Sequence, residues 1–410
     1  MNPRFLIATL IFISIDIYAF QSVRAVSHRH GPYWLYWGAT AFFYATALYV
    51  FLAFDRAQEN GIIQLAVALF ALLYIPKIIL TIGLLIQDIS RLFISVYHSV
   101  TTHGATDFFP SRRRFINRIF IGLAAVPFVA VIHGIIWGKY HYRVVKKTLH
   151  FDDLPEAFDG LTITQISDIH SGSFTDREKV EQAVNKVNQQ GSDLIFFTGD
   201  LVNNRAVEML PWIHTFKKLR APLGIYATLG NHDYGDYIGW PSPESKAKNG
   251  KLLRDIHAQL GFDLLDNESR QIERSGQKIN VIGVQNWGEK PFPQLGDLDK
   301  ATQGIAAGEF NLLLSHDPTH FDRKVKSFSK KIHLTFSGHT HGMQFGIEIP
   351  SWGIKWSPIQ YRYPKWAGLY EAGGRYLYVN RGFGYLAFPG RVGEWPEITV
   401  IELKKSRGSA

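Results

Sequence analysis

The segment KIHLTFSGHTHGMQ, residues 331–344, joins a strand-like apolar run to two histidines that are separated by one residue. Side chains i and i+2 of an extended chain share a face, so His339 and His341 can both reach one site. A lone His-x-His is weak evidence for metal binding, because a polar turn can also hold two imidazoles. Its meaning depends on the partners that the rest of the 410-residue chain offers.

Four further strand-like segments end in polar residues of similar kinds. They are LTITQISDIHSG (161–172), SDLIFFTGDL (192–201), GIYATLGNHDY (224–234) and FNLLLSHDPTHF (310–321). Helical patterns at 176–190 and about 206–219 alternate with the first three, which predicts an α/β sheet. Such sheets place their chemistry just beyond the strand ends. Additional strands are predicted at 278–287, 376–388 and 396–403.

The five strand ends carry carboxylate, amide and imidazole groups in a fixed order. The residues are Asp168, His170, Asp200, Asn231, His232, Asp233, His316, His339 and His341. Taken singly, an aspartate after a strand is often a turn residue, and Asn-His-Asp can cap a helix. Together, such groups on rigid strand ends can hold two divalent cations ~3.5–4 Å apart, with one carboxylate between the mutually repelling ions. Ligands without thiolates favour manganese, iron or zinc.

Composition and hydropathy separate the first third of the chain from the rest. Charged residues make up 19%, aromatic residues 14%, and the net charge is +9 with no cysteine. The missing cysteines exclude disulfides and thiolate metal sites. Four apolar runs, at 5–20, 33–54, 61–86 and 119–138, are each long enough to cross ~30 Å of hydrocarbon. Asp16 interrupts the first run; it is either a polar residue near a helix end or a functional residue, and we expect the former.

The predicted organisation is a four-helix transmembrane region at 1–145 followed by a catalytic α/β domain at 150–405. Arginines in the loops 21–32 and 88–118 place those loops in the cytoplasm, and the loop 55–60 is net acidic. An even number of spans then places the catalytic domain outside, although the basic stretch from Lys139 to Lys147 opposes this orientation. We therefore expect a multi-pass protein of the bacterial inner membrane with a periplasmic catalytic domain.

The segment SRRRFINRIFIGLAAVPFVA, residues 111–130, resembles a twin-arginine export signal. Arg112 and Arg113 precede an apolar stretch, as such a receptor-read signal requires. Use of the export machinery would deliver a folded domain that already carries its cofactors. The alternative is a basic anchor in front of a membrane span.

As a set, the strand-end motifs resemble the calcineurin-like metallophosphoesterase superfamily over residues 155–403. The membrane front and the ending YVNRGFG…PEITVIEL resemble its membrane-associated bacterial branch of YkuE- and YaeI-type phosphohydrolases. The resemblance implies a double β-sandwich flanked by helices, with two divalent metals at one edge. It implies hydrolysis of a phosphoester or pyrophosphate bond by a hydroxide that the metals activate.

The resemblance also implies a role for each motif residue. Asp168, His170 and His341 would bind the first metal, and Asn231, His316 and His339 the second. Asp200 would bridge them, while His232 would stabilise the transition state or protonate the leaving oxygen. The remaining candidates are weaker. We expect His214, His257, His320 and His333 to be surface or packing residues, with a supporting role open for His320 and Asp317.

The substrate is less constrained by the motifs. The membrane front and the segment SWGIKWSPIQYRYPKWAGLY (351–370), rich in Trp, Tyr and cations, favour a lipid-linked phosphate. A covering hairpin with core aromatics is the alternative for that segment. Arg381 would contact a substrate phosphate or form a structural ion pair. Rival functions are a tethered nuclease or nucleotidase acting on a soluble substrate and a non-enzymatic membrane sensor; no specific nucleic-acid binding is predicted.

Overall fold

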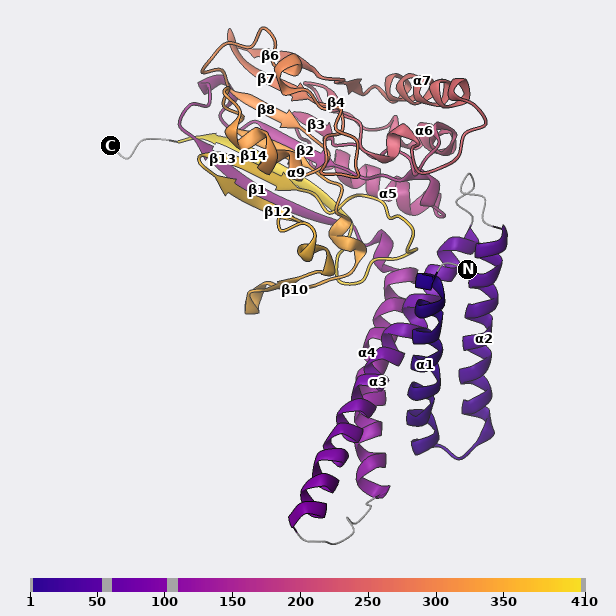
Figure 1. Ribbon diagram of the computed structural model, residues 1–410. Coiled ribbons are helices and arrows are strands. Elements are labelled where there is room, and N and C mark those ends of the chain that lie inside the picture. The colour runs from indigo at the N-terminus through magenta and orange to yellow at the C-terminus, as the bar shows by residue number, and fades with distance from the viewer. Residues whose placement is uncertain (1–2, 54–60, 102–109, 407–410) are drawn as a thin grey trace. The chain divides into compact units, whose positions relative to one another are not determined.

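The computed structural model describes residues 3–53, 61–101 and 110–406. The chain divides into two compact units, which meet between Ile135 and Ile136. Each unit is described by itself (Figure 1). The predicted acidic loop 55–60 and part of the predicted loop 88–118 lie outside the described residues.

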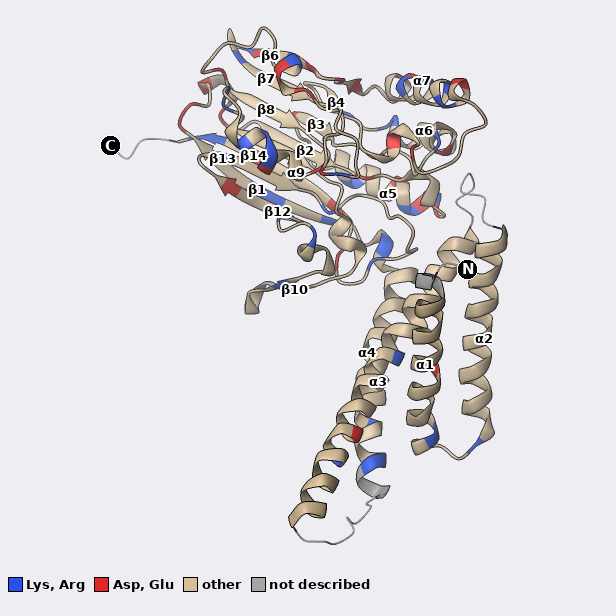
Figure 2. Ribbon diagram, viewed as in Figure 1, with Lys and Arg blue, Asp and Glu red and all other residues tan. Residues whose placement is uncertain are grey.

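The first unit consists of long apolar helices. They are α1 (Pro3–Val26), α2 (His30–Ala53), α3 (Gly61–Thr101) and α4 (Pro110–Ile136). Each is long and apolar enough to cross a membrane, and α2 contains no Lys, Arg, Asp or Glu. Figure 2 shows charged residues scattered over the second unit, whereas these four helices consist mostly of uncharged residues. These features indicate a membrane protein.

The helices run further than the apolar stretches that predicted them. Helix α3 continues to Thr101 instead of ending near residue 86, and α4 begins at Pro110 instead of near 119. The reason is that apolar length measures only the part that crosses hydrocarbon. A helix satisfies its backbone internally and therefore continues through polar residues beyond it.

Asp16 corrects an expectation from the sequence. It lies within α1 rather than near a helix end, and it is buried at 1% exposure. The Lys77 ammonium on α3 lies 2.6 Å from one of its carboxylate oxygens and also donates to Thr40 on α2 at 2.8 Å. The hydroxyls of Tyr44 and Tyr74 donate to the other oxygen at 2.8 and 3.1 Å. The aspartate therefore ties three helices of this unit together.

The second unit contains two six-stranded sheets. The first has the order β1 (Arg143–Phe151), β14 (Glu397–Lys405), β2 (Thr162–Ile166), β3 (Leu194–Phe197), β4 (Ile225–Ala227), β5 (Asp263–Leu264). The second has the order β12 (Gly368–Ala372), β13 (Arg375–Val379), β9 (Leu334–Ser337), β8 (Asn311–Leu314), β7 (Gln277–Gly283), β6 (Glu268–Arg274). A separate hairpin pairs β10 (Ile347–Ile349) with β11 (Ile354–Trp356).

A shared apolar core lies between the two sheets. Ile163 and Phe196 of the first sheet belong to the same buried cluster as Leu312 and Phe336 of the second. Three helices pack on the first sheet: α5 (Arg177–Asn188), α6 (Ile213–Phe216) and α7 (Pro243–Leu260). Two short helices contribute to the core beside the second sheet: α8 (Leu298–Ala301) and α9 (Thr319–Arg323). This arrangement confirms the predicted helix-flanked double β-sandwich.

One predicted helix differs in kind. The segment expected to be helical at about 206–219 forms a 3₁₀-helix, Ala206–Trp212, before the single turn of α6. Pro211 lies inside it, and because proline lacks an N–H and clashes with the preceding turn, a regular α-helix does not continue through it. The helix predicted at 176–190 is present as α5, where the Asp176 side chain accepts the Lys179 N–H at 3.1 Å.

Parallel pairing determines where the site forms. Strands β2, β3 and β4 are parallel neighbours in the first sheet, and β8 and β9 are parallel neighbours in the second. The carboxyl ends of parallel strands lie at the same edge of a sheet. All five polar strand ends are therefore brought to one edge of the sandwich.

Candidate metal centre

The backbone after the strands is folded back sharply at the candidate ligands. Five of them have left-handed φ values: 53° for Asp168, 47° for His170, 59° for Asp200, 73° for His339 and 51° for His341. Residues other than glycine adopt this region rarely and at a cost, and such strain collects at functional sites. The surrounding sandwich holds these turns in place.

The first group of candidate ligands is Asp168, His170 and His341. Their ligand atoms lie within 4.8 Å of one another, and all three residues are buried. His341 Nε2 lies 3.2 Å from Asp168 Oδ1 and 3.0 Å from His170 Nε2. The three come from the ends of β2 and β9, so the group joins the two sheets.

The second group contains Asp200, His316 and His339, with Asn231 between the rings. The first three offer ligand atoms within 4.8 Å of one another. The Asn231 side-chain oxygen lies 3.1 Å from His316 Nε2 and 2.7 Å from His339 Nδ1. His339 thus turns its Nδ1 toward this group.

Asp200 faces both groups through one oxygen. Its Oδ2 lies 3.6 Å from His170 Nε2 in the first group and 3.1 Å from His316 Nε2 in the second. Its Oδ1 accepts the backbone N–H of His232 at 2.9 Å, which fixes the orientation of the carboxylate. This is the geometry that a bridging carboxylate requires.

The electrostatics of the cluster fit bound cations. Burial lowers the pKa of His170 well below its ordinary value, so the ring is neutral and its lone pair is available. Burial would raise the pKa of Asp200, but the neighbouring His316 and His232 hold it well below its usual range. Although burial acts against it, the Asp200 charge raises the pKa of His316 to about 10. The buried Asp200 carboxylate is therefore stabilised by positive charge beside it, and a divalent cation bound by these residues would supply that charge in place of the proton on His316.

Two glycines leave the room that the carboxylates need. A Cβ on Gly230 would lie 2.2 Å from Asp200 Oδ1, and a Cβ on Gly338 would lie 2.2 Å from Asp168 Oδ2. Any other residue would displace the carboxylate, since glycine alone lacks the Cβ.

Comparison with known proteins agrees with this geometry. Residues 161–343 match the family model described as calcineurin-like phosphoesterase, and residues 3–139 match that of the probable calcineurin-like phosphoesterase transmembrane domain. The uncharacterized metallophosphoesterase YkuE of Bacillus subtilis is 30% identical over 312 residues, covering 72% of this chain and 98% of YkuE. The chain belongs to the calcineurin-like metallophosphoesterase family. It is a metal-dependent phosphohydrolase with a transmembrane region, which confirms the resemblance seen in the sequence.

Two other members of the family carry a membrane region or a known lipid substrate in their names. A transmembrane protein with metallophosphoesterase domain from Danio rerio is 28% identical over 288 residues, 68% of this chain and 61% of that protein. The UDP-2,3-diacylglucosamine pyrophosphatase LpxG of Chlamydia muridarum is 28% identical over 300 residues, 61% of this chain and 87% of LpxG.

The twin-arginine interpretation is not supported. Arg112 and Arg113 belong to the beginning of α4, inside the segment that matches the transmembrane-domain model of the family. Their place at the start of a candidate membrane span corresponds to the alternative, a basic anchor.

His232 lies beside the metallophosphoesterase ligands without belonging to either group. Its ring centroid is 5.0 Å from that of His170. Its Nδ1 lies 2.7 Å from the backbone oxygen of Asn203, so Nδ1 carries the proton and donates it to that carbonyl. This hydrogen bond fixes the tautomer and leaves Nε2 available.

Several residues that orient the ligands were missed or left open by the sequence. His339 Nε2 lies 2.8 Å from the Tyr363 hydroxyl and 3.4 Å from Asp317 Oδ2, which keeps its Nδ1 toward Asn231. Asn231 in turn donates its amide N–H to the Tyr237 hydroxyl at 2.8 Å. Only Asp317, directly after His316, had a sequence signal; the two tyrosines reach the site from loops.

Asp233 supports the loops beneath Asp200. Its carboxylate accepts the backbone N–H groups of Gly230, Asp200 and Leu201, each at 2.9 Å. Burial and then the Asp200 charge raise the pKa of Asp233 to about 7. The residue was noted in the Gly-Asn-His-Asp motif, but its contacts show that it positions backbone rather than metal.

Arg381 forms ion pairs with three carboxylates. It lies 2.8 Å from Glu394 and 3.0 Å from Glu348, and a further hydrogen bond joins it to Glu397. These contacts correspond to the structural ion pair that was the alternative for Arg381, and the contact with a substrate phosphate stays a prediction. The fully buried Arg391, which the sequence did not single out, donates to the backbone oxygens of Gly384 and Arg381 at 2.6 and 2.8 Å.

The other histidines lie where they were expected, at the surface or in packing contacts. His214 is exposed, and the buried ring of His257 lies 2.9 Å from the Leu253 carbonyl oxygen. His320 stacks on Trp287, and its Nδ1 contacts a serine hydroxyl instead of a ligand. His333 pairs with Asp153 at 2.9 Å.

Proposed function

We propose that this chain hydrolyses a phosphoester or pyrophosphate bond in a lipid-linked substrate at a membrane surface. The observation that carries the hydrolytic centre is the single Asp200 oxygen lying 3.6 Å from one ligand group and 3.1 Å from the other. A carboxylate shared in this way lets two cations lie close together without prohibitive repulsion.

The ligand roles follow from the two groups. Asp168, His170 and His341 would hold one cation. Asn231, His316 and His339 would hold the other, with Asp200 shared between the two groups. When bound, the two cations supply a nucleophile at neutral pH and neutralise charge on the phosphoryl oxygens. The oxygen and nitrogen ligands suit manganese, iron or zinc.

His232 acts on the substrate itself. The Asn203 carbonyl holds its Nδ1 proton, so Nε2 is the atom that meets the phosphoryl group or the leaving oxygen. In its protonated form, Nε2 donates a proton to the leaving oxygen or stabilises the charge of the transition state.

The aromatic segment after the metal ligands favours a lipid substrate. The turn that carries His341 leads directly into the β10–β11 hairpin, where Trp352 is 75% exposed; Tyr361, which follows it, is 80% exposed. Such amphipathic rings suit a headgroup layer. Tyr363 and Trp366 are buried at 5% and 3% and form a small core, so the segment combines both predicted roles. The name of LpxG gives a diacylated substrate for that relative, which supports the choice of a lipid-linked substrate here.

Location is part of the same proposal. Positive charges at residues 24 and 29 and at 91 and 112–118 favour the cytoplasmic side of a bacterial inner membrane for these segments. With an even number of spans, the catalytic unit would then lie on the outer face, opposite the side on which many nucleotide-linked lipids are made. A phospholipid or another lipid-linked phosphate on that face is the preferred substrate.

The test uses the full chain in detergent, loaded with Mn²⁺. Phosphate release is measured from a bacterial lipid extract in mixed micelles and from a soluble nucleotide, with Asn231→Ala as the inactive control. We expect release from the lipid fraction only, and a weaker rate for Trp352→Ser with Tyr361→Ser on micelles. Equal hydrolysis of the soluble nucleotide with and without micelles would instead identify a tethered nucleotidase.

A further inference from the structure

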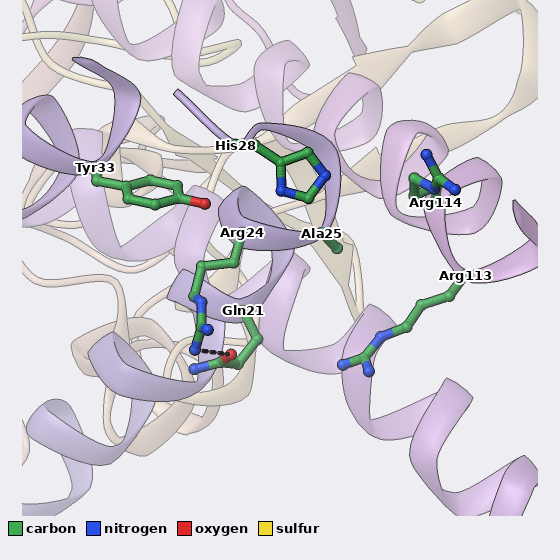
Figure 3. A pocket seen from close by; sticks show the side chains of 7 residues that line it. All are labelled: Gln21, Arg24, Ala25, His28, Tyr33, Arg113 and Arg114. Carbon is green, nitrogen blue, oxygen red and sulfur yellow. Dashed lines mark hydrogen bonds between the residues drawn. The ribbon is translucent and has the colours of Figure 1, made fainter. Parts of the chain in front are cut away.

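A second polar site lies within the membrane unit. A cavity of about 440 Å³ opens where α1, the start of α2 and the start of α4 come together (Figure 3). Its lining residues are Gln21, Arg24, Ala25, His28, Tyr33, Arg113 and Arg114. Three of these residues are arginines, and none is acidic.

The arginines of this cavity have no ion-pair partner in the part of the chain that the structure describes. Within the described ranges, Arg24, Arg113 and Arg114 form no ion pair, and Arg24 makes only a long hydrogen bond of 3.4 Å to Gln21. The Nε of Arg113 is buried and has no hydrogen-bond partner among the described atoms. A buried guanidinium N–H without a partner is costly, so this atom indicates a missing acceptor.

Asp88 of the same unit does not line the cavity. It accepts the Tyr18 hydroxyl at 2.7 Å and lies 3.7 Å from Arg91. Three arginines that line one cavity match a phosphate group, which accepts several charge-assisted hydrogen bonds in the forked geometry of arginine.

The surroundings of the cavity indicate a phosphate attached to lipid chains. One helical turn deeper into the candidate spans, the same faces of α1 and α2 carry Ile17 and Trp37, which are 53% and 37% exposed. Residues four apart share a helix face. If a lipid headgroup occupied the cavity, its acyl chains would therefore lie along these apolar side chains. A soluble anion would leave the same side chains uncovered.

We propose that the cavity lined by Arg24, Arg113 and Arg114 binds the phosphate headgroup of an anionic phospholipid. Basic pockets between transmembrane helices on the cytoplasmic side are a recurrent form of lipid recognition. The site is independent of the phosphohydrolase centre, because its residues belong to the other unit. It gives the twin-arginine segment a binding role in place of an export role.

The test measures thermal unfolding of the full chain in detergent with added phosphatidylglycerol, phosphatidylcholine or inorganic phosphate. Phosphatidylglycerol is expected to raise the melting temperature more than the other two. Arg24→Gln with Arg113→Gln should weaken its apparent affinity about tenfold or more, since charged hydrogen bonds are lost. Arg118→Gln is the matched control, because Arg118 lies exposed on the same helix outside the cavity.

Three outcomes would overturn the proposal. These are equal stabilisation by phosphatidylcholine, equal stabilisation by inorganic phosphate, and an unchanged response of the double variant. Two further measurements on the same samples separate binding from folding. By circular dichroism, the double variant should keep its helical content. By native mass spectrometry, it should lose the bound anionic lipid, whereas Arg118→Gln should retain that lipid. Retention of that lipid by a folded double variant also contradicts the site.

Discussion

The two units of this protein each bury a polar cluster, and the clusters differ in how their charges are balanced. In the membrane unit, every contact of Asp16 joins a donor to an acceptor: Lys77 at 2.6 Å and two tyrosine hydroxyls. In the catalytic unit, ring nitrogens face each other, with His170 Nε2 and His341 Nε2 only 3.0 Å apart. Burial of charge alone therefore does not mark a metal site; an excess of lone pairs does.

The two clusters also differ in the backbone conformation of their residues. Asp16 and Lys77 are in the interior of long helices, and neither has a left-handed φ. Asp168, Asp200 and His339 lie in strained turns with φ of 53°, 59° and 73°. A cluster that fastens helices uses regular backbone, whereas a cluster that must aim several lone pairs at one point uses turns that cost energy.

The largest effect is expected from Asp200→Asn. The amide keeps the shape of the carboxylate but removes the shared negative charge, so both cations should be lost. Turnover should fall by about a thousandfold or more, because the cations supply several kcal/mol of transition-state stabilisation. Phosphate release and metal content by mass spectrometry measure the effect. Retention of both metals by this variant would contradict the bridging role.

Lys77→Met tests the buried cluster around Asp16 in the membrane unit. It leaves Asp16 buried without its cation, and the free energy of unfolding should fall by about 3–5 kcal/mol. Asp16→Asn combined with Lys77→Met should restore much of that loss, because neither charge then remains unpaired. Chemical denaturation of the full chain in detergent measures both. A double variant no more stable than the single variant would show that the pair is not the source of the stability.

His232→Ala separates the chemistry from the metals. His232 lies next to the ligand groups but belongs to neither, so metal content should be unchanged while turnover falls by at least about a hundredfold. Steady-state kinetics and metal analysis of the same preparation provide the comparison. Loss of metal comparable to that in Asp200→Asn would make His232 a ligand instead.

The smallest effect is expected from Asp317→Asn. Asp317 lies 3.4 Å from the distal nitrogen of His339, and weakening such an outer contact should lower metal affinity about 10–100-fold. Asp322→Asn, a change in a carboxylate that pairs with Lys365, is the control and should leave the affinity unchanged. Competition with a metal chelator measures both. Equal affinities for the two variants would remove Asp317 from the supporting shell.

The sandwich and its ligand set were predictable because both depend on local signals. A strand followed by Gly-His-x-His or Gly-Asn-His-Asp specifies where a side chain emerges, and parallel strands deliver their ends to one edge. The roles of Tyr237 and Tyr363 were not predictable, because each reaches the site through a loop whose path depends on the packed fold. The same holds for Arg381, whose glutamate partners lie 13, 16 and 33 residues away along the chain.

The sequence by itself determined the chemistry available to this protein: four apolar runs that demand a membrane, and oxygen and nitrogen ligands in order at strand ends. Only the tertiary structure decided which atoms meet. It pairs Asp16 with a lysine 61 residues away, turns Nδ1 of His339 toward Asn231, and places one Asp200 oxygen between two ligand groups. The physical reason is that residue type and periodicity are local properties, whereas charge compensation depends on contacts between segments far apart in the chain.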